Sequence, residues 1–485
     1  MSRVVAGCLT VLVVLAAAVA LLGGGDDAAG GPASGSTLEA TFADRDGDGV
    51  LERAPGEPLL DRTDLAPAAA PGRTLAVLAQ ISDAHVRDEE SPGRAFLLDR
   101  TGAPFTSTFR PQEALTPQVL DAAVASVNDL SPQAVLVTGD VVDSAQRNEL
   151  DQAIAVLRGG RVDPDSGARG YDGPQDAANA DPFFYRPDVD APQHPGLLDR
   201  AQLPFRSPGL RAPWLPVAGN HDLLVQGEAP ASASVERLTL GSRAPLELGP
   251  APDVPRVSGA LTSALLERVL GQGFPGETAP TEADPRRAHP APAEVLGTLR
   301  RGSGAAGGVG RLDYAYDVGP RLRVIALDLV KRGGGSDGRI TAEQLVWLER
   351  RLARAGRRWI VVASHQSLAS SEGGGRALGV LDSSPRVLAA VSGHTHTSSI
   401  EPRRSAAGGY WLIGTPSLVD YPQQARALRV VETEGGGVAI EAWMLDTAPG
   451  ELPDTARDLA YLDAQGGRPQ GAAGGREDRN VRLYR

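Results

Sequence analysis

The sequence predicts an α/β fold, and three observations lead to this prediction. From about residue 75 onward, short apolar runs alternate with segments of helical periodicity. The apolar runs are nearly continuous, which is typical of strands that are buried on both faces. The chain has 485 residues, enough for one large domain with insertions. Alternation of strands and helices over such a length indicates an α/β sandwich.

Nine apolar runs are the expected strands: LAVLAQ, AVLV, WLPVA, LRVIAL, WIVVAS, VLAAVS, YWLIG, LRVVE and VAIEAWML. Residues 116–130 and 341–356 have the periodicity of amphipathic helices. The second helix is expected to begin with a capping box formed by Thr341 and Gln344, and to end near Gly356. Strand signals and helix signals are therefore both present in the order that an α/β domain requires.

Composition divides the chain into four parts, the first of which is the N-terminal segment, residues 1–22. Residues 73–446 carry the strand and helix signals and are the expected domain. Within it, residues 159–211 and 226–310 are rich in Pro and Gly and are expected to be insertions that shape a binding site or lack regular structure. A lead-in rich in Gly, Ala, Pro and Asp covers residues 23–72, and residues 447–485 are expected to form a C-terminal tail.

The N-terminal segment, residues 1–22, has the pattern of a secretory signal or a membrane anchor. Arg3 precedes an apolar run from Val4 to Leu22, and Ala18 and Ala20 offer a small-x-small cleavage site. The run approaches the roughly 20 residues that a membrane-spanning helix needs. The protein is therefore expected outside the cytoplasm, either secreted or attached to the membrane through residues 4–22.

Charge and cysteine content exclude several classes of site. The formal net charge is -12, which disfavours stable binding of nucleic acid because such binding needs clustered cations. Cys8, in the N-terminal segment, is the single cysteine, so the folded part has no disulfide and no thiolate metal ligand. A metal held by this chain must use His, Asp, Glu or Asn.

Potential metal ligands follow five of the expected strands. The motifs are D-A-H at 83–85, G-D at 139–140, G-N-H-D at 219–222, a histidine at 365 and G-H-T-H at 393–396. The carboxyl ends of parallel strands are where open α/β sheets collect their active sites. The five motifs are therefore expected to meet.

The distribution of histidine supports the same interpretation. Five of the seven histidines occupy these strand ends: His85, His221, His365, His394 and His396. The other two, His194 and His289, lie beside prolines and are expected to be ordinary loop residues. Each motif alone is more often a turn or a satisfied polar pair than a ligand set. Five of them in order predict a metal centre.

The ligand types indicate the chemistry of that centre. Imidazole and carboxylate groups suit Mn, Fe or Zn at a hydrolytic site. Two such cations, held about 3.5–4 Å apart, need a bridging carboxylate and further ligands around it. They activate a bridging hydroxide for attack on phosphorus, and a separate acid must then serve the leaving oxygen.

An acidic motif in the lead-in, DRDGDG at 44–49, is similar to the start of a calcium-binding loop. The twelfth position of such a loop would be Pro55, where calcium loops of this type need a bidentate Glu. We therefore expect a solvated acidic turn there.

The series D-x-H, G-D, G-N-H-D, H and G-H-x-H resembles that of the calcineurin-like metallophosphoesterases, over about residues 75–445. The resemblance implies a four-layer αββα sandwich of two packed β-sheets flanked by helices. It also implies roles for nine residues: Asp83, His85 and His396 hold the first metal, Asn220, His365 and His394 hold the second, Asp140 bridges them, His221 is the general acid or transition-state stabiliser, and Asp222 orients His221.

Flanking segments, among them QISDAHVRDEESPGRAFLLDR and EDRNVRLYR, resemble an uncharacterised secreted bacterial subgroup of that family. Two positions depart from patterns within the family. Asp143 stands where the purple acid phosphatases have a tyrosine, so no iron-tyrosinate colour is expected. Gln366 replaces a second histidine that many members place after His365.

The resemblance thus implies an exported, binuclear metal-dependent phosphoesterase that acts on a small-molecule phosphate ester. The G-N-H-D and G-H-x-H motifs, without the tyrosine, favour phosphodiesters over phosphomonoesters. The alternatives are an extracellular phosphomonoesterase that scavenges phosphate and a non-catalytic metal-binding protein of the envelope. A nuclease would need a basic groove, which the composition does not indicate.

Overall fold

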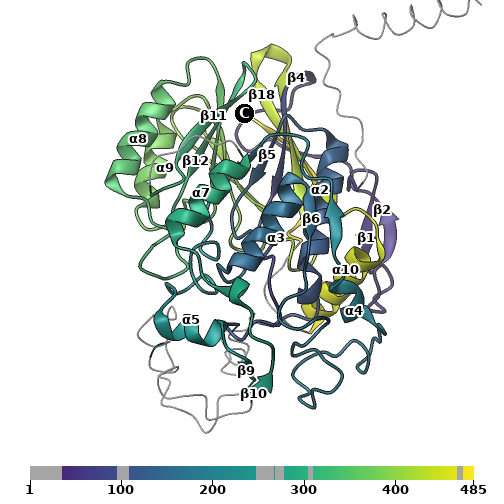
Figure 1. The fold of residues 1–485 in the computed structure, drawn as a ribbon. Coiled ribbons are helices and arrows are strands. Elements are labelled where there is room, and N and C mark those ends of the chain that lie inside the picture. Colours follow the sequence, from purple (N-terminus) through teal and green to yellow (C-terminus); the bar gives the residue numbers. More distant parts are fainter. Residues whose placement is uncertain (1–34, 95–108, 247–266, 268–277, 304–309, 467–472) are drawn as a thin grey trace, which may run out of the picture.

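Two β-sheets form the centre of the molecule in the computed structural model (Figure 1). The structure describes residues 35–94, 109–246, 267, 278–303, 310–466 and 473–485. Helices lie on the outer surfaces of the two sheets (Figure 1). The predicted α/β sandwich, with two packed sheets flanked by helices, is confirmed.

Seven strands form the first sheet: β3 Leu60–Arg62, β4 Pro71–Ile81, β5 Ala134–Val137, β8 Trp214–Pro216, β17 Gln424–Thr433, β18 Val438–Asp446 and β19 Val481–Tyr484. Their spatial order is β3-β19-β18-β17-β4-β5-β8. The strands β4, β5 and β8 run parallel to one another. Their carboxyl ends therefore meet at one edge of this sheet.

Six strands form the second sheet: β11 Tyr314–Val318, β12 Leu322–Leu327, β13 Trp359–Ser364, β14 Val387–Ser392, β15 Ser399–Arg403 and β16 Tyr410–Gly414. Their spatial order is β11-β12-β13-β14-β16-β15. The strands β12, β13, β14 and β16 are parallel. The side chain of Gln80 joins the two sheets, because its Nε2 donates to the carbonyl of Ser392 at 3.1 Å.

The described helices are α2 Thr116–Leu130, α3 Arg147–Arg158, α4 Leu197–Ala201, α5 Ala233–Thr239, α7 Pro292–Ser303, α8 Ala342–Ala353, α9 Gly374–Asp382 and α10 Glu451–Gln465. Helix α2 packs against β4, β17 and β18, with α3 and α10 beside it. Helices α8 and α9 lie together on the six-stranded sheet, on the opposite side of the molecule (Figure 1).

Alternation along the strands explains this layering. In β12, Val324 and Ala326 belong to the core between the two sheets, whereas Ile325 and Leu327 pack with α8 and α9. Successive side chains of a strand point to opposite faces. A strand that packs against the other sheet with one face and against helices with the other must therefore be apolar at every position. This agrees with the continuous apolar runs in the sequence.

Both predicted helices are present. Helix α2 has the predicted bounds, and α8 begins after a capping box in which Thr341 accepts from the amide of Gln344 and Gln344 accepts from the amide of Thr341. Helix α8 ends at Ala353, just before the predicted Gly356. The capping box satisfies two amides that a helix leaves without intrahelical partners.

The predicted bounds of the domain, 73–446, are too narrow. Strand β19 lies in the seven-stranded sheet between β18 and β3, so the segments expected as a tail and as a lead-in both contribute to it. Helix α10 also packs on α2. Pairing between residues some 420 positions apart has no local sequence signal, because the partners become neighbours only in the folded chain.

Short elements occur in the remaining segments. They are β1 Ala40–Ala43 and β2 Glu52–Pro55 in the lead-in, β6 Gly160–Val162 and β7 Phe205–Ser207 in the first insertion, and β9 Arg243–Pro245 and β10 Thr278–Pro280 in the second. The predicted signal or anchor, residues 1–22, lies outside the described residues. Within the described part of the chain, no helix is long and apolar enough to cross a membrane.

Candidate metal centre

The five strand-end motifs converge at the carboxyl edges of the two sheets. Asp83 and His85 follow β4, Asp140 follows β5, and Asn220 with His221 follows β8 in the first sheet. His365 follows β13 in the second sheet, and His394 and His396 follow β14. Their side chains form three overlapping groups that could each hold a metal ion: Asp83 with His85 and His396, His85 with Asp140 and His221, and Asp140 with His365 and His394.

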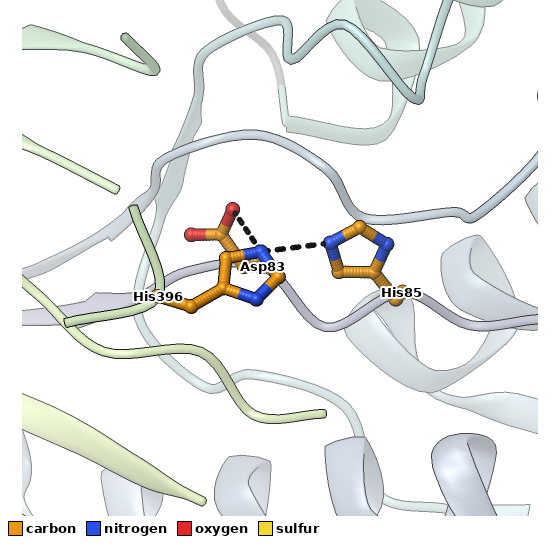
Figure 2. A group of neighbouring side chains, drawn as sticks. All are labelled: Asp83, His85 and His396. Atoms are coloured by element: carbon orange, nitrogen blue, oxygen red, sulfur yellow. Dashed lines mark hydrogen bonds and ion pairs between the residues drawn. The ribbon is translucent and has the colours of Figure 1, made fainter. Parts of the chain in front are cut away.

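The first half-site consists of Asp83, His85 and His396 (Figure 2). The Nε2 atoms of His85 and His396 are 3.2 Å apart, and Nε2 of His396 is 3.4 Å from Oδ1 of Asp83. Two imidazole nitrogens and a carboxylate oxygen thus face one point from two different sheets. Nitrogen and oxygen donors of this kind suit a divalent transition metal.

The second half-site consists of Asp140, His365 and His394, with Asn220 beside them. Nε2 of His365 is 3.0 Å from Oδ2 of Asp140 and 3.0 Å from Oδ1 of Asn220. The amide of Asn220 is oriented from its other end, because its Nδ2 donates to the carbonyl of Gly227 at 3.1 Å. The oxygen of Asn220 is therefore the atom directed at the half-site.

Asp140 lies between the two half-sites. Its Oδ2 is 3.0 Å from Nε2 of His365 in the second half-site and 3.8 Å from Nε2 of His85 in the first. Its Oδ1 accepts from the backbone amide of His221 at 2.8 Å. A carboxylate that bridges two cations must occupy such a position.

Hydrogen bonds to the far ring nitrogen orient three of the histidines. Nδ1 of His85 donates to Asp143 at 3.1 Å, Nδ1 of His365 donates to the carbonyl of Thr138 at 2.8 Å, and Nδ1 of His396 donates to Asp420. In each ring, Nε2 is left for the centre of the site. Metal-binding histidines are commonly held in this way by a carboxylate or a carbonyl.

The backbone at the site adopts an uncommon conformation. Five of the predicted ligands have positive φ: Asp83 (52°), His85 (43°), Asp140 (46°), His394 (69°) and His396 (57°). Such conformations are unfavourable for residues other than glycine and cluster at functional sites, where the surrounding structure maintains them. A functional role for these five residues explains their unfavourable conformations better than the need to turn the chain at the strand ends.

Two glycines of the motifs are required by close packing. A Cβ at Gly219 would lie 2.1 Å from Oδ1 of Asp140, and a Cβ at Gly393 would lie 2.3 Å from Oδ2 of Asp83. Any larger residue would displace the carboxylate. The glycines of G-N-H-D and G-H-T-H thus make room for the predicted ligands from the neighbouring strands.

The histidines differ in protonation. Burial, together with the nearby His221, lowers the pKa of His85 to about 4, and burial beside His365 lowers the pKa of His394 to about 4. Burial opposes charge on His365 and His396 as well, but Asp140 raises the pKa of His365 to about 9 and Asp420 raises that of His396 to about 10. Metal binding needs neutral imidazole, so cations and protons compete for the latter two rings.

The donor set fits two divalent cations. The carboxylates of Asp83 and Asp140 are almost fully buried, and a buried charge is costly unless it is paired or coordinates a metal. Four imidazoles (His85, His365, His394 and His396), two carboxylates and one amide oxygen then surround two neighbouring positions that share Asp140.

His221 lies at the rim of this centre. Its ring centroid is 4.5 Å from that of His85, and its side chain keeps 22% of its surface exposed, whereas that of His85 keeps 3%. Its Nδ1 donates to the carbonyl of Asp143 at 2.6 Å, so Nε2 is the atom available to a substrate.

The predicted role of Asp222 is wrong. Its carboxylate accepts from the backbone amides of Val141 at 2.8 Å and Gly219 at 2.8 Å, and therefore holds two site loops together. Burial and the nearby Asp140 raise its pKa to about 7. His221 and Asp222 lie in the turn that follows β8, and their side chains have different partners: the ring of His221 meets the carbonyl of Asp143, whereas the carboxylate of Asp222 meets backbone amides.

Asp143 is a site residue whose role the sequence did not reveal. Besides His85 and His221, it contacts Arg87, whose guanidinium donates to Oδ1 at 2.9 Å. Burial alone would raise the pKa of Asp143, but Arg87, His85 and Arg94 hold it well below its ordinary value. In the sequence, Asp143 is distinguished only by standing three residues after Asp140, where the purple acid phosphatases have a tyrosine. Asp420, which holds His396 and pairs with Arg110, had no signal in the sequence.

We expect Asp143→Asn to weaken both the fold and the metal centre. Breaking one partner of a buried ion-pair network costs about 3–5 kcal/mol, and loss of a residue that orients a metal ligand typically costs about 10–100-fold in metal affinity. Urea unfolding and competition with a chelator measure the two effects. Asp151→Asn, on the exposed face of α3, is the control. Unchanged stability and affinity in Asp143→Asn would contradict this role.

A second group of carboxylates lies far from this site in the sequence, at Asp44, Asp46 and Asp48. The carboxylate of Asp44 accepts from the backbone amides of Gly47 at 2.7 Å and Gly49 at 3.0 Å. The side chains of Asp46 and Asp48 are exposed. These contacts are those of an acidic turn closed on its own backbone.

Comparison with protein-family models finds no match, and comparison with curated proteins finds none either. Among solved structures, this chain is similar to a dimetal phosphatase from Danio rerio, with 13% identity over 78% of this chain and 100% of the other and a TM-score of 0.39. It is also similar to the sulfate thiohydrolase SoxB from Thermus thermophilus, with 14% identity over 82% of this chain and 61% of the other and a TM-score of 0.31. Both similarities are distant.

Proposed function

We propose that this chain is a binuclear metal-dependent phosphoesterase of the calcineurin-like type. The observation that carries the proposal is the convergence of five strand-end motifs on two half-sites that share one buried carboxylate, Asp140. The two packed sheets and the order of the motifs agree with the resemblance found in the sequence. Its substrate would be a small-molecule phosphate ester, and the net charge of -12 argues against nucleic acid.

The cations would be held by Asp83, His85 and His396 on one side and by Asn220, His365 and His394 on the other, with Asp140 between them. When bound, two divalent cations supply an activated water as nucleophile and neutralise charge on the phosphoryl oxygens. The protein contributes the fixed geometry, because Asp143, Asp420 and the carbonyl of Thr138 hold three of the rings in place.

His221 would supply the proton for the leaving oxygen. Its Nδ1 is fixed on the carbonyl of Asp143, so a proton on Nε2 can be presented to a bound ester in a defined direction. General acid catalysis by a positioned imidazole commonly contributes about 10²–10⁴-fold to the rate.

Hydrolysis of bis-p-nitrophenyl phosphate by the purified, Mn²⁺-loaded protein tests the proposal. We expect turnover that a chelator abolishes and that added Mn²⁺ restores. Turnover of p-nitrophenyl phosphate alone would assign the protein to the monoesterases. Two bound cations without turnover of either ester would overturn the enzymatic proposal and favour a metal-binding protein of the envelope.

We also propose that the protein is exported, on the basis of the apolar run from Val4 to Leu22. Cell fractionation of the full-length chain and of a variant without residues 1–22 tests this. We expect the full chain outside the cytoplasm and the shortened chain inside it. The same distribution of both forms would contradict a targeting role for the segment.

A further inference from the structure

The side chain of Gln366 lies beside the second half-site, and its neighbours fix the orientation of its amide group. Gln366 follows His365 directly and is only 1% exposed. Its Nε2 donates to Oδ1 of Asn220 at 3.2 Å and to the backbone carbonyl of Ser336 at 2.9 Å. Both partners are acceptors, so a reversed amide would place its oxygen against two other oxygens. The NH2 group of Gln366 therefore faces Asn220.

The amide of Asn220 is fixed in the same way. Its Nδ2 donates to the carbonyl of Gly227 at 3.1 Å, and its Oδ1 lies 3.0 Å from Nε2 of His365. An amide oxygen has two lone pairs. One lone pair of Oδ1 accepts from Gln366, and the other is left for a cation in this half-site. The hydrogen bond from Gln366 is thus compatible with the binding of a cation by Asn220.

A glycine-rich loop between β12 and α8, residues 333–338 (GGGSDG), lies next to Gln366. Besides the carbonyl that accepts from Gln366, the loop brings its last glycine so close that a Cβ at Gly338 would lie 2.8 Å from Cβ of Gln366. The amide of Gly335 donates to the carbonyl of Glu228 at 2.7 Å. The loop is therefore attached both to Gln366 and to the turn that contains Glu228.

This turn closes a ring of contacts around Asn220. The carbonyl of Gly227 accepts from Asn220, and the next carbonyl, that of Glu228, accepts from the glycine-rich loop. A Cβ at Gly227 would lie 2.3 Å from Nδ2 of Asn220, so the turn lies directly against the amide. Asn220 is thus connected to the loop at both ends of its amide, by Gln366 at the oxygen and by the turn at the nitrogen. A rotation of this amide would break contacts on both sides.

We propose that Gln366 is a positioning residue for the second cation: its amide holds the oxygen of Asn220 toward the half-site and links the occupancy of that site to the glycine-rich loop. The proposal rests on the proposed function, because it takes the half-site of Asp140, His365 and His394 to hold a cation. Gln366 is not itself expected to be a ligand, because its NH2 group faces Asn220. Loss of a side chain that orients a metal ligand typically lowers the affinity by about 10–100-fold.

Gln366→Met removes the donor and keeps the volume of the side chain. The test is calorimetric titration of the metal-free full chain with Mn²⁺, both in the wild-type background and in Asp83→Asn, where we expect only the second half-site to bind. In both backgrounds, Gln366→Met should weaken the binding of the second cation by about 10–100-fold, and that of the first cation should change by less than about twofold. Equal affinities of the wild type and Gln366→Met for both cations would overturn the proposal.

Gln175→Met is the matched control. Gln175 is also buried, its Nε2 donates to the carbonyls of Pro111 at 3.1 Å and Tyr185 at 3.0 Å, and its Oε1, like that of Gln366, has no hydrogen-bond partner in the described part of the chain. The two variants should lose similar stability, whereas only Gln366→Met should change the affinity for Mn²⁺. An equal loss of affinity in Gln175→Met would assign the effect to general stability and overturn the proposal.

Hydrogen exchange of the wild type, followed by mass spectrometry, tests the link to the loop even if Gln366→Met does not fold. Exchange in residues 333–338 should slow by about tenfold when free Mn²⁺ is about ten times the dissociation constant of the second cation, because opening of the loop then requires release of that cation. No slowing would overturn the proposal. Binding of fewer than two cations by the wild type would overturn the proposed function, and this proposal with it. Two bound cations with the expected loss in Gln366→Met, but no turnover of any ester, would overturn only the enzymatic function.

Discussion

Asp140→Asn is expected to remove both cations and with them the activity. Asp140 is the carboxylate that the two half-sites share, at 3.0 Å from Nε2 of His365 and 3.8 Å from Nε2 of His85. An asparagine keeps the volume but removes the negative charge and one oxygen donor. Affinity for both cations should fall by more than the roughly 10–100-fold that follows loss of an orienting residue.

The measurement is the metal content of the dialysed protein, together with turnover of bis-p-nitrophenyl phosphate. Asp83→Asn is the matched comparison, since Asp83 is also a buried aspartate but belongs to the first half-site only. We expect Asp83→Asn to retain one cation per chain and Asp140→Asn to retain neither. Two tightly bound cations in Asp140→Asn, or loss of only one, would show that Asp140 does not bridge.

The positions of the candidate ligands at strand ends could be predicted from the sequence, because each depends on a local signal. A parallel strand that is buried on both faces is a continuous apolar run, and its carboxyl end is where the run stops. His365 and His394 both follow the end of such a run. That these ends meet follows from the parallel order of β4, β5 and β8 in one sheet and of β13 and β14 in the other.

The residues that hold the ligands could not be predicted in this way. Asp420 is 24 positions from His396, and Asp143 is 58 positions from His85. A hydrogen bond over such a separation leaves no periodicity in the sequence. The prediction for Asp222 relied on its position next to His221 in the sequence and was wrong, because its carboxylate accepts from the backbone amides of Val141 and Gly219.

Separation along the sequence also explains why the predicted bounds of the domain, 73–446, are too narrow. Val481 and Leu483 are fully buried in β19, but the strand is only four residues long and follows a segment rich in Gly. Its partner β3 is even shorter and lies near the other end of the chain. Short strands with distant partners are recognisable only once the sheet is assembled.

His221→Ala is expected to keep both cations and to lose most of the turnover. The ring lies at the rim of the centre, half-buried, with Nδ1 fixed on the carbonyl of Asp143 and Nε2 available to the substrate. Removing a general acid typically costs about 10²–10⁴-fold in rate. The loss should be greater for an ester with an alkyl leaving group than for a nitrophenyl ester, because an alkoxide needs protonation more than a stabilised phenolate does.

The metal content of His221→Ala distinguishes a role of His221 as general acid from a role as metal ligand, which the geometry also allows. His221 also groups with His85 and Asp140 as a possible metal ligand, and in that case His221→Ala would lose a cation as well as activity. His289→Ala is the control, since His289 pairs with Glu236 in the second insertion. Full activity of His221→Ala on an alkyl ester would remove its role as acid. Two retained cations, together with a loss that depends on the leaving group, would mean that His221 acts on the substrate and that the seven other donor groups suffice to bind both metals.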